Sequence, residues 1–255
     1  MICFKNEDQK IAACGSSCVG DVHCLKILAW YRPLTVQVSV FNTSYRAFLF
    51  DMDGTVLNSI AAAERIWTIW ALRHGVDVET FLPTIHGVRA IDTISRLALP
   101  GVDAEAEAAW ITEAEIEDVE GIVEVSGAAS FLNSLPANQW AIVTSAPRPL
   151  ALRRMAAAGI PEPGVMVTAE DVSAGKPDPA GYRLAARRLG VEPVDCLIFE
   201  DAAVGIRAGE AAGAHVMVIT ATHVHPLQTP HATLAGYDSV EARVDLHSQI
   251  SLYTI

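Results

Sequence analysis

The stretch from residue 48 to residue 56 constrains the fold of this chain more than any other. We expect residues 47–50, a short apolar run, to form a buried strand that ends in Asp51 and Asp53. Residues two apart in an extended chain point the same way, so both carboxylates should face one point. Gly54 then lets the backbone pass close to a ligand. Because two converging acids repel each other unless a cation or a shared proton compensates, this pattern predicts a binding site rather than a turn with solvated aspartates.

After residue 127, predicted strands and helices alternate along the chain. The strands are continuous apolar runs, which is typical of strands covered on both faces. This pattern predicts an α/β fold with a doubly wound, Rossmann-like parallel sheet. We expect strands at 140–143, 165–167, 196–199 and 215–219, and helices at 128–135, 149–158, 179–189 and 204–212.

The segment between the first strand and residue 127 has a different pattern. Apolar residues recur at helical spacing over 59–73, 91–99 and 105–119, and we expect no strand between Leu57 and Ser126. We therefore predict an inserted helical unit at 58–127 and a core made of 45–57 and 128–255. Residues 1–44 are interpreted as an N-terminal extension without a catalytic role, although 35–40 alternate like a strand. No clear pattern is found from residue 221 onward.

Charge and composition narrow the class of partner. The formal net charge is −12, which argues against binding to nucleic acid or to an anionic membrane surface. No apolar run reaches the roughly 18 residues that a membrane-spanning helix needs. No signal peptide is evident, and the cysteines do not have the spacing of a zinc pair. We expect a cytoplasmic monomer that acts on a small molecule.

Polar residues also follow three other predicted strands or loops of the core. They are Thr144-Ser145, Lys176 between a glycine and a proline, and Glu200-Asp201 at the end of a very apolar strand. Each alone has a simpler explanation: a helix start, a solvated lysine, a paired acid. Parallel strands end on one side of a sheet, however, so these groups should converge with Asp51. Carboxylates with one lysine and two hydroxyls suit Mg²⁺ and a phosphoryl group.

Taken in order, these residues resemble the four motifs of the haloacid dehalogenase superfamily, over about residues 45–220. The predicted helical unit stands where members with a helical cap insert that cap. Within the superfamily the chain is most similar to bacterial sugar phosphatases of the 2-deoxyglucose-6-phosphate phosphatase kind, and it also resembles β-phosphoglucomutases. The motif residues are Asp51-Met52-Asp53-Gly54-Thr55, Thr144, Lys176-Pro177, and Glu200-Asp201 with Gly205, Ile206, Ala208 and Gly209.

The resemblance implies a role for each motif residue. Asp51 would be the nucleophile that becomes an aspartyl-phosphate, and Asp53 would serve as general acid and then general base. Thr144 and Ser145 would hold the phosphate, and Lys176 would balance the charge on Asp51 and the phosphate. Dehalogenases lack the second aspartate, so Asp53 argues against halide chemistry.

The resemblance also implies a metal ion and a specificity loop. Mg²⁺ would bind Asp51, the backbone carbonyl of Asp53, and Asp201, with Glu200 bound directly or through water. In the cap, His86 and Arg89 would contact the substrate.

We therefore expect a Mg²⁺-dependent phosphatase of small sugar phosphates, such as hexose or sugar-alcohol phosphates. A β-phosphoglucomutase-like phosphomutase is the alternative, and a non-catalytic binding protein of the same fold is a third hypothesis. The intact set Asp51, Asp53, Lys176 and Asp201 argues against the third. Residue types alone do not name the preferred sugar.

Overall fold

The strand that precedes the two aspartates lies inside a six-stranded sheet. In the computed structural model, which describes residues 43–224 and 228–255, β1 (Ala47–Phe50) pairs in parallel with β4 (Trp140–Val143) and β6 (Cys196–Glu200). The strand order is β5-β4-β1-β6-β7-β8, and every pairing is parallel. The remaining strands are β5 (Val165–Val167), β7 (His215–Ile219) and β8 (Ala232–Leu234). The predicted fold class is confirmed. The alternating segment at 35–40, and most of the predicted extension, lie outside the described residues.

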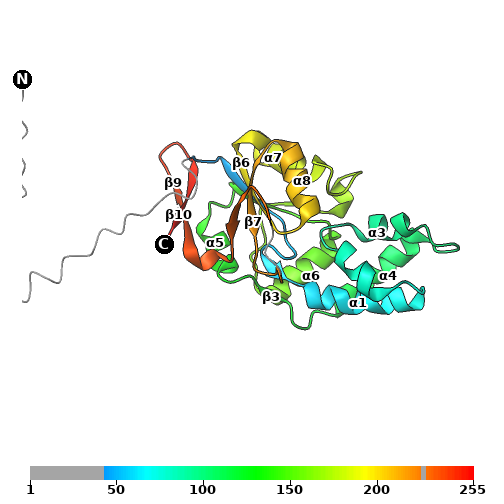
Figure 1. Cartoon of the computed structure of the whole chain (residues 1–255). Helices are drawn as coiled ribbons and strands as arrows, with labels where there is room; N and C mark the ends of the chain where they lie inside the picture. The colour runs from blue at the N-terminus through cyan, green and yellow to red at the C-terminus, as the bar shows by residue number, and fades with distance from the viewer. Residues whose placement is uncertain (1–42, 225–227) are drawn as a thin grey trace, which may run out of the picture. The chain divides into compact units, whose positions relative to one another are not determined.

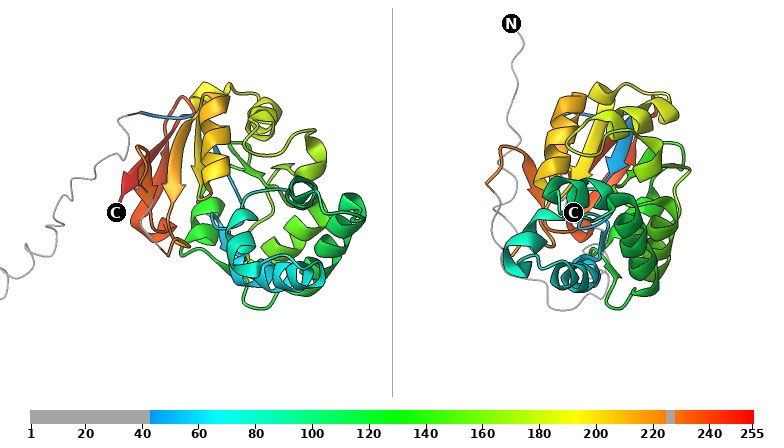
Figure 2. Two further views of the ribbon diagram at one scale, coloured as in Figure 1. Left: turned by 45° about the vertical axis from the view of Figure 1, so that its right-hand side comes forward. Right: turned by 90° about the vertical axis from the view of Figure 1, so that its right-hand side faces the viewer.

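Helices cover both faces of this sheet (Figures 1 and 2). Phe48 and Phe50 point to the face that packs against α5 (Ala128–Ser134) and α6 (Arg148–Ala158). Leu49 points to the opposite face, where α7 (Ala180–Leu189) and α8 (Ala203–Ala212) pack. All three side chains are fully buried. Alternate side chains of the central strand therefore pack in two separate hydrophobic cores, one on each face of the sheet.

The inserted unit has a hydrophobic core of its own, centred on Trp67, Trp70 and Ile111. It is entered and left through β2 (Leu57–Asn58) and β3 (Val123–Glu124), which pair antiparallel. The expectation of no strand between Leu57 and Ser126 was therefore wrong, because two-residue strands show no detectable periodicity. The helices of the unit are α1 (Ile60–Arg73), α2 (Val78–Phe81), the 3₁₀ turn η3 (Leu82–Thr84), α3 (Ala90–Leu97) and α4 (Ala104–Glu117).

The C-terminal part also contains strands that the sequence pattern did not reveal. Besides β8, which joins the sheet edge, β9 (Val240–Val244) and β10 (Ile250–Thr254) form an antiparallel hairpin that packs on the same core as Phe48. Short 3₁₀ turns are η4 (Ala169–Asp171), η5 (Pro193–Asp195) and η6 (Tyr237–Ser239). Within residues 43–224 and 228–255, no helix has the length and apolar character needed to cross a bilayer.

Candidate active site

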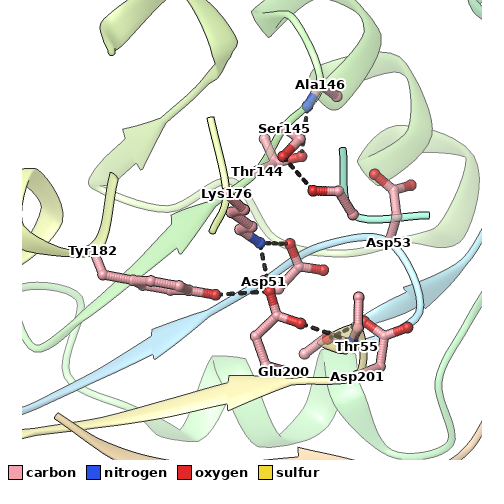
Figure 3. Close-up of polar contacts among 12 residues, drawn as sticks. Asp51, Asp53, Thr55, Thr144, Ser145, Ala146, Lys176, Tyr182, Glu200 and Asp201 are labelled. Carbon is pink, nitrogen blue, oxygen red and sulfur yellow. Dashed lines mark hydrogen bonds and ion pairs between the residues drawn. The ribbon is translucent and has the colours of Figure 1, made fainter. Parts of the chain in front are cut away.

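The motif residues converge at the carboxyl edge of the sheet (Figure 3). Asp51 directly follows β1, Thr144 directly follows β4, and Glu200 ends β6 with Asp201 next to it. Because β4 and β6 are the two neighbours of β1, these side chains meet at one point. Lys176 joins them from the loop that precedes α7.

Lys176 is held between two buried acids. Its Nζ donates hydrogen bonds to Asp51 and, over 2.6 Å, to Oε1 of Glu200. The hydroxyl of Tyr182 donates to the same oxygen at 3.0 Å, and the backbone N–H of Ala202 donates to Oε2 at 2.9 Å. Both oxygens of Glu200 thus already accept protein hydrogen bonds, so this residue orients the lysine that contacts the predicted nucleophile.

Two glycines make room for the acids. A Cβ at position 205 in α8 would lie 1.5 Å from Oε1 of Glu200, so Gly205 is required for the glutamate to sit where it does. A Cβ at position 54 would lie 2.0 Å from Oδ2 of Asp201, and Gly54 also has a φ of +89°, which L side chains rarely adopt. These two motif glycines are therefore explained by sterics around carboxylates.

The site concentrates negative charge in a buried place. Asp51, Glu200 and Asp201 are nearly inaccessible, and Lys176 is the cation that contacts two of them. Burial raises the pKa of Asp51 to about 7, although the charge of Lys176 partly offsets this effect. Burial, reinforced by Glu200 and Asp51, raises the pKa of Asp201 well above its usual range. Burial disfavours the Lys176 ammonium, yet the two acids outweigh it and raise its pKa.

The chemistry of this cluster fits a divalent cation. One oxygen each from Asp51, Glu200 and Asp201 lies within 4.8 Å of the others. Three carboxylates against one ammonium leave net negative charge, and an all-oxygen donor set is what hard cations prefer. The carboxylate of Asp53 is not part of this set, and the predicted contact through its backbone carbonyl stays a prediction.

The Asp53 carboxylate is held by different partners. Its Oδ1 accepts hydrogen bonds from Ser59 Oγ at 2.5 Å and from Nη1 of Arg154 at 3.0 Å. Nη2 of Arg154 in turn lies 3.1 Å from Oε1 of Glu115, which belongs to α4 of the inserted unit. Burial raises the pKa of Glu115 to about 7, with Arg154 acting in the opposite direction.

A cavity of about 80 Å³ lies between the core and the inserted unit. That volume holds several water molecules. The sheet side contributes Asp51, Asp53, Thr144, Ser145, Arg154 and Asp201, and the inserted unit contributes Trp67, Ile85, His86, Thr112 and Glu115 among others.

The two predicted phosphate-binding hydroxyls have different surroundings. Thr144 is buried, and its Oγ1 accepts a hydrogen bond from the backbone N–H of Ala146 at 3.0 Å. Ser145 donates from Oγ to the backbone carbonyl of Gly87 at 2.8 Å, which ties the core to the inserted unit (Figure 3). Both residues line the cavity, and their contact with phosphate stays a prediction.

The two predicted specificity residues are separated by the structure. His86 lines the cavity and lies 3.2 Å from Oε1 of Glu64. Arg89 lies outside it: Nε and Nη2 donate to Asp92 at 2.6 and 2.9 Å, and its other bonds reach the backbone carbonyls of residues 172–173. Gly87, which lies between the two residues, has a φ of +74°. In this arrangement Arg89 anchors the inserted unit to the core loop.

Comparison with known proteins identifies the family. Residues 45–213, well over half of the chain, match the haloacid dehalogenase-like hydrolases. The chain is a haloacid dehalogenase-like hydrolase. The resemblance noted from the four motifs is thereby confirmed.

Named relatives of this hydrolase are phosphatases. Hexitol phosphatase A of Escherichia coli is 42% identical over 189 residues, which cover 72% of this chain and 86% of that protein. 2-Deoxyglucose-6-phosphate phosphatase 1 of Saccharomyces cerevisiae is 33% identical over 69% of this chain and 80% of that protein. The structure of a β-phosphoglucomutase from Clostridium difficile superposes with a TM-score of 0.62 over 69% of this chain and 84% of that one. The sequence identity is 20%, so this likeness shows a shared fold.

Sequence reasoning missed several residues at the site of this hydrolase. Arg154 and Glu115 carry charge on the buried faces of their helices, four residues after Leu150 and Ile111 respectively. A charged residue in the apolar stripe of a helix is the signal that could have found them. Trp67 packs in the hydrophobic core of the inserted unit and also lines the cavity.

Proposed function

We propose that this hydrolase is a Mg²⁺-dependent phosphatase of small sugar-alcohol and sugar phosphates that works through an aspartyl-phosphate. The observation that carries the proposal is the position of Asp51, which accepts a hydrogen bond from Lys176 and lines the cavity beside Asp53. The relatives support a phosphomonoesterase, and the 42% identity to hexitol phosphatase A favours sugar-alcohol phosphates. The cytoplasmic location expected earlier belongs to the same proposal and rests on sequence alone.

The residues at hand account for two steps. A carboxylate oxygen of Asp51 attacks phosphorus, and the bond from phosphorus to the sugar oxygen breaks as Asp53 gives that oxygen a proton. Water then attacks the aspartyl-phosphate and passes a proton to Asp53, which releases inorganic phosphate and regenerates Asp51. Lys176 offsets negative charge on Asp51 and the phosphoryl oxygens throughout.

The Mg²⁺ ion would be held by Asp51, the backbone carbonyl of Asp53 and Asp201. Glu200 would bind it directly or through a water molecule. A divalent cation there supplies charge neutralisation for the attacking carboxylate and the transferred group. The cluster of one oxygen each from Asp51, Glu200 and Asp201 supports this assignment, because the single Lys176 ammonium offsets only part of the charge of three carboxylates.

The phosphomutase alternative has weaker support. Its motifs are the same, and the likeness to the mutase is one of fold at 20% identity. The named relatives that match at 42% and 33% identity are phosphatases. We therefore place hydrolysis ahead of transfer to a second hydroxyl.

Product analysis tests the proposal. Purified protein with Mg²⁺ should release inorganic phosphate and free alcohol in equal amounts from hexitol phosphates and, more slowly, from hexose 6-phosphates. β-Glucose 1-phosphate serves as the discriminating substrate: conversion to glucose 6-phosphate without phosphate release would identify a mutase instead.

The cap residues give a paired prediction. Because His86 lines the cavity, His86→Ala should change the ranking of sugar phosphates and lower kcat/KM for the best one by about tenfold. Arg89→Ala should lower kcat/KM similarly for every substrate, including p-nitrophenyl phosphate, since it removes a contact between cap and core. Kinetics on the same panel measure both. A change of ranking in Arg89→Ala alone would restore the specificity role first expected for it.

A further inference from the structure

Arg154 forms the centre of a buried ionic chain that joins the two parts of the enzyme. Its side chain is 7% exposed, and that of Glu115, its partner from α4, is 8% exposed. Asp53, its partner from the core, is 26% exposed at the edge of the cavity. A guanidinium is costly to bury unless it is paired, and here one arm serves each carboxylate. The chain therefore depends on both parts of the molecule.

The geometry fixes the side chain of Asp53. Oδ1 accepts from both Ser59 and Arg154, so the carboxylate is held at one oxygen by two donors. Oδ2 is then the oxygen left to meet a substrate or a water molecule. A planar guanidinium presents its two arms at a fixed spacing, which a lysine ammonium does not reproduce.

The burial of Arg154 also has a free-energy cost that hydrophobic packing does not explain. Its Nε has no hydrogen-bond partner within the described part of the chain, although it is buried. A buried donor without a partner is unfavourable and is commonly found where function requires a particular side-chain position. An apolar residue at this helix position would avoid that cost.

We propose that Arg154 is a positioning residue that aims Asp53 at the leaving oxygen, and that Glu115 makes this position dependent on the cap being in place. The inference rests on the proposed function, in which Asp53 gives a proton to the departing alcohol. When the cap moves away, Arg154 loses one of its two carboxylates and Asp53 loses its fixed partner geometry. The reaction is thereby coupled to closure over a bound substrate.

Leaving groups provide the test. The value of kcat/KM reports steps up to transfer of the phosphoryl group, and only a poor leaving group needs a proton in that step. p-Nitrophenolate leaves readily, phenolate leaves less readily, and a sugar-alcohol oxygen leaves poorly. Loss of a positioned Asp53 should therefore harm the three phosphate esters in that rising order.

The experiment compares Arg154→Met, Arg154→Lys and Glu115→Gln with Arg187→Met, the same change at an exposed arginine on α7. We expect Arg154→Met to lower kcat/KM about 100-fold for a hexitol phosphate and less than about fivefold for p-nitrophenyl phosphate. Glu115→Gln should show the same order with a loss of about tenfold, and Arg187→Met should match wild type. Should Arg154→Met fail to fold, Arg154→Lys is measured for the same order.

Two results would overturn the inference. Equal losses on all three esters would mean that Arg154 only supports the fold. A rise in KM for the hexitol phosphate with kcat unchanged would mean that it binds the sugar instead. If the wild-type enzyme hydrolyses the aryl phosphates and no sugar-alcohol phosphate, the proposed substrate class is wrong. The role of Arg154 is then still tested by comparing the loss of kcat/KM for phenyl phosphate with the loss for p-nitrophenyl phosphate.

Discussion

Asp51→Asn will lower kcat for every phosphate ester by about 10⁴-fold or more, because an amide cannot attack phosphorus in place of a carboxylate. We expect the variant to keep the fold, since the change removes one negative charge from a cluster of three acids and one lysine. Steady-state phosphate release, together with circular dichroism and thermal melting, measures both parts. A loss smaller than about tenfold would contradict the nucleophile assignment.

A covalent intermediate provides the sharper version of this experiment. Acid quenching of wild type during turnover of a ³²P-labelled substrate should give labelled protein that hydroxylamine cleaves, as expected for an acyl phosphate. Asp51→Asn should give none. Glu192→Gln, the same carboxylate-to-amide change at an exposed residue, serves as the matched control and should label like wild type.

Removal of divalent metal is expected to reduce activity to below about 1% of the Mg²⁺ form, because three buried carboxylates would then lack their main counter-charge. Mg²⁺ should restore activity, and Ca²⁺ should inhibit, since it prefers more ligands and longer bonds than a small octahedral site offers. Dialysis against EDTA followed by metal titration measures this. Full activity in excess EDTA after dialysis would rule out the metal requirement.

The melting temperature of the protein measures metal binding at the same site and requires no catalytic turnover. A ligand at about 100 times its Kd stabilises the folded state by about 2.7 kcal/mol, which corresponds to a rise in Tm of about 5–10 °C for a chain of this size. Asp201→Asn should abolish most of the Mg²⁺-dependent rise, because Asp201 supplies one of the three clustered oxygens. Glu192→Gln should retain it. An equal rise in both variants would place the metal elsewhere.

Local sequence determined the core of the fold and the identity of the motif residues. The apolar run before Asp51 specifies a strand buried on both faces, since Phe48 and Leu49 alternate between two hydrophobic cores. The polar residues that follow predicted strands then predict that Thr144 and Glu200 lie near Asp51, because parallel strands end on one side of a sheet. Chemistry and fold could be predicted because both depend on patterns within a few residues.

Tertiary structure alone decided how the inserted unit meets the core. Nothing local to Arg154 or Glu115 indicates that they pair, since α6 and α4 are far apart in sequence and their contact depends on packing between two hydrophobic clusters. The loop containing His86 and Arg89 shows the same limit: residue types suggested two substrate contacts, and backbone direction placed one in the cavity and one against the core loop. Side-chain direction in a turn is set by dihedral angles and by neighbours distant in sequence, and neither can be read from spacing.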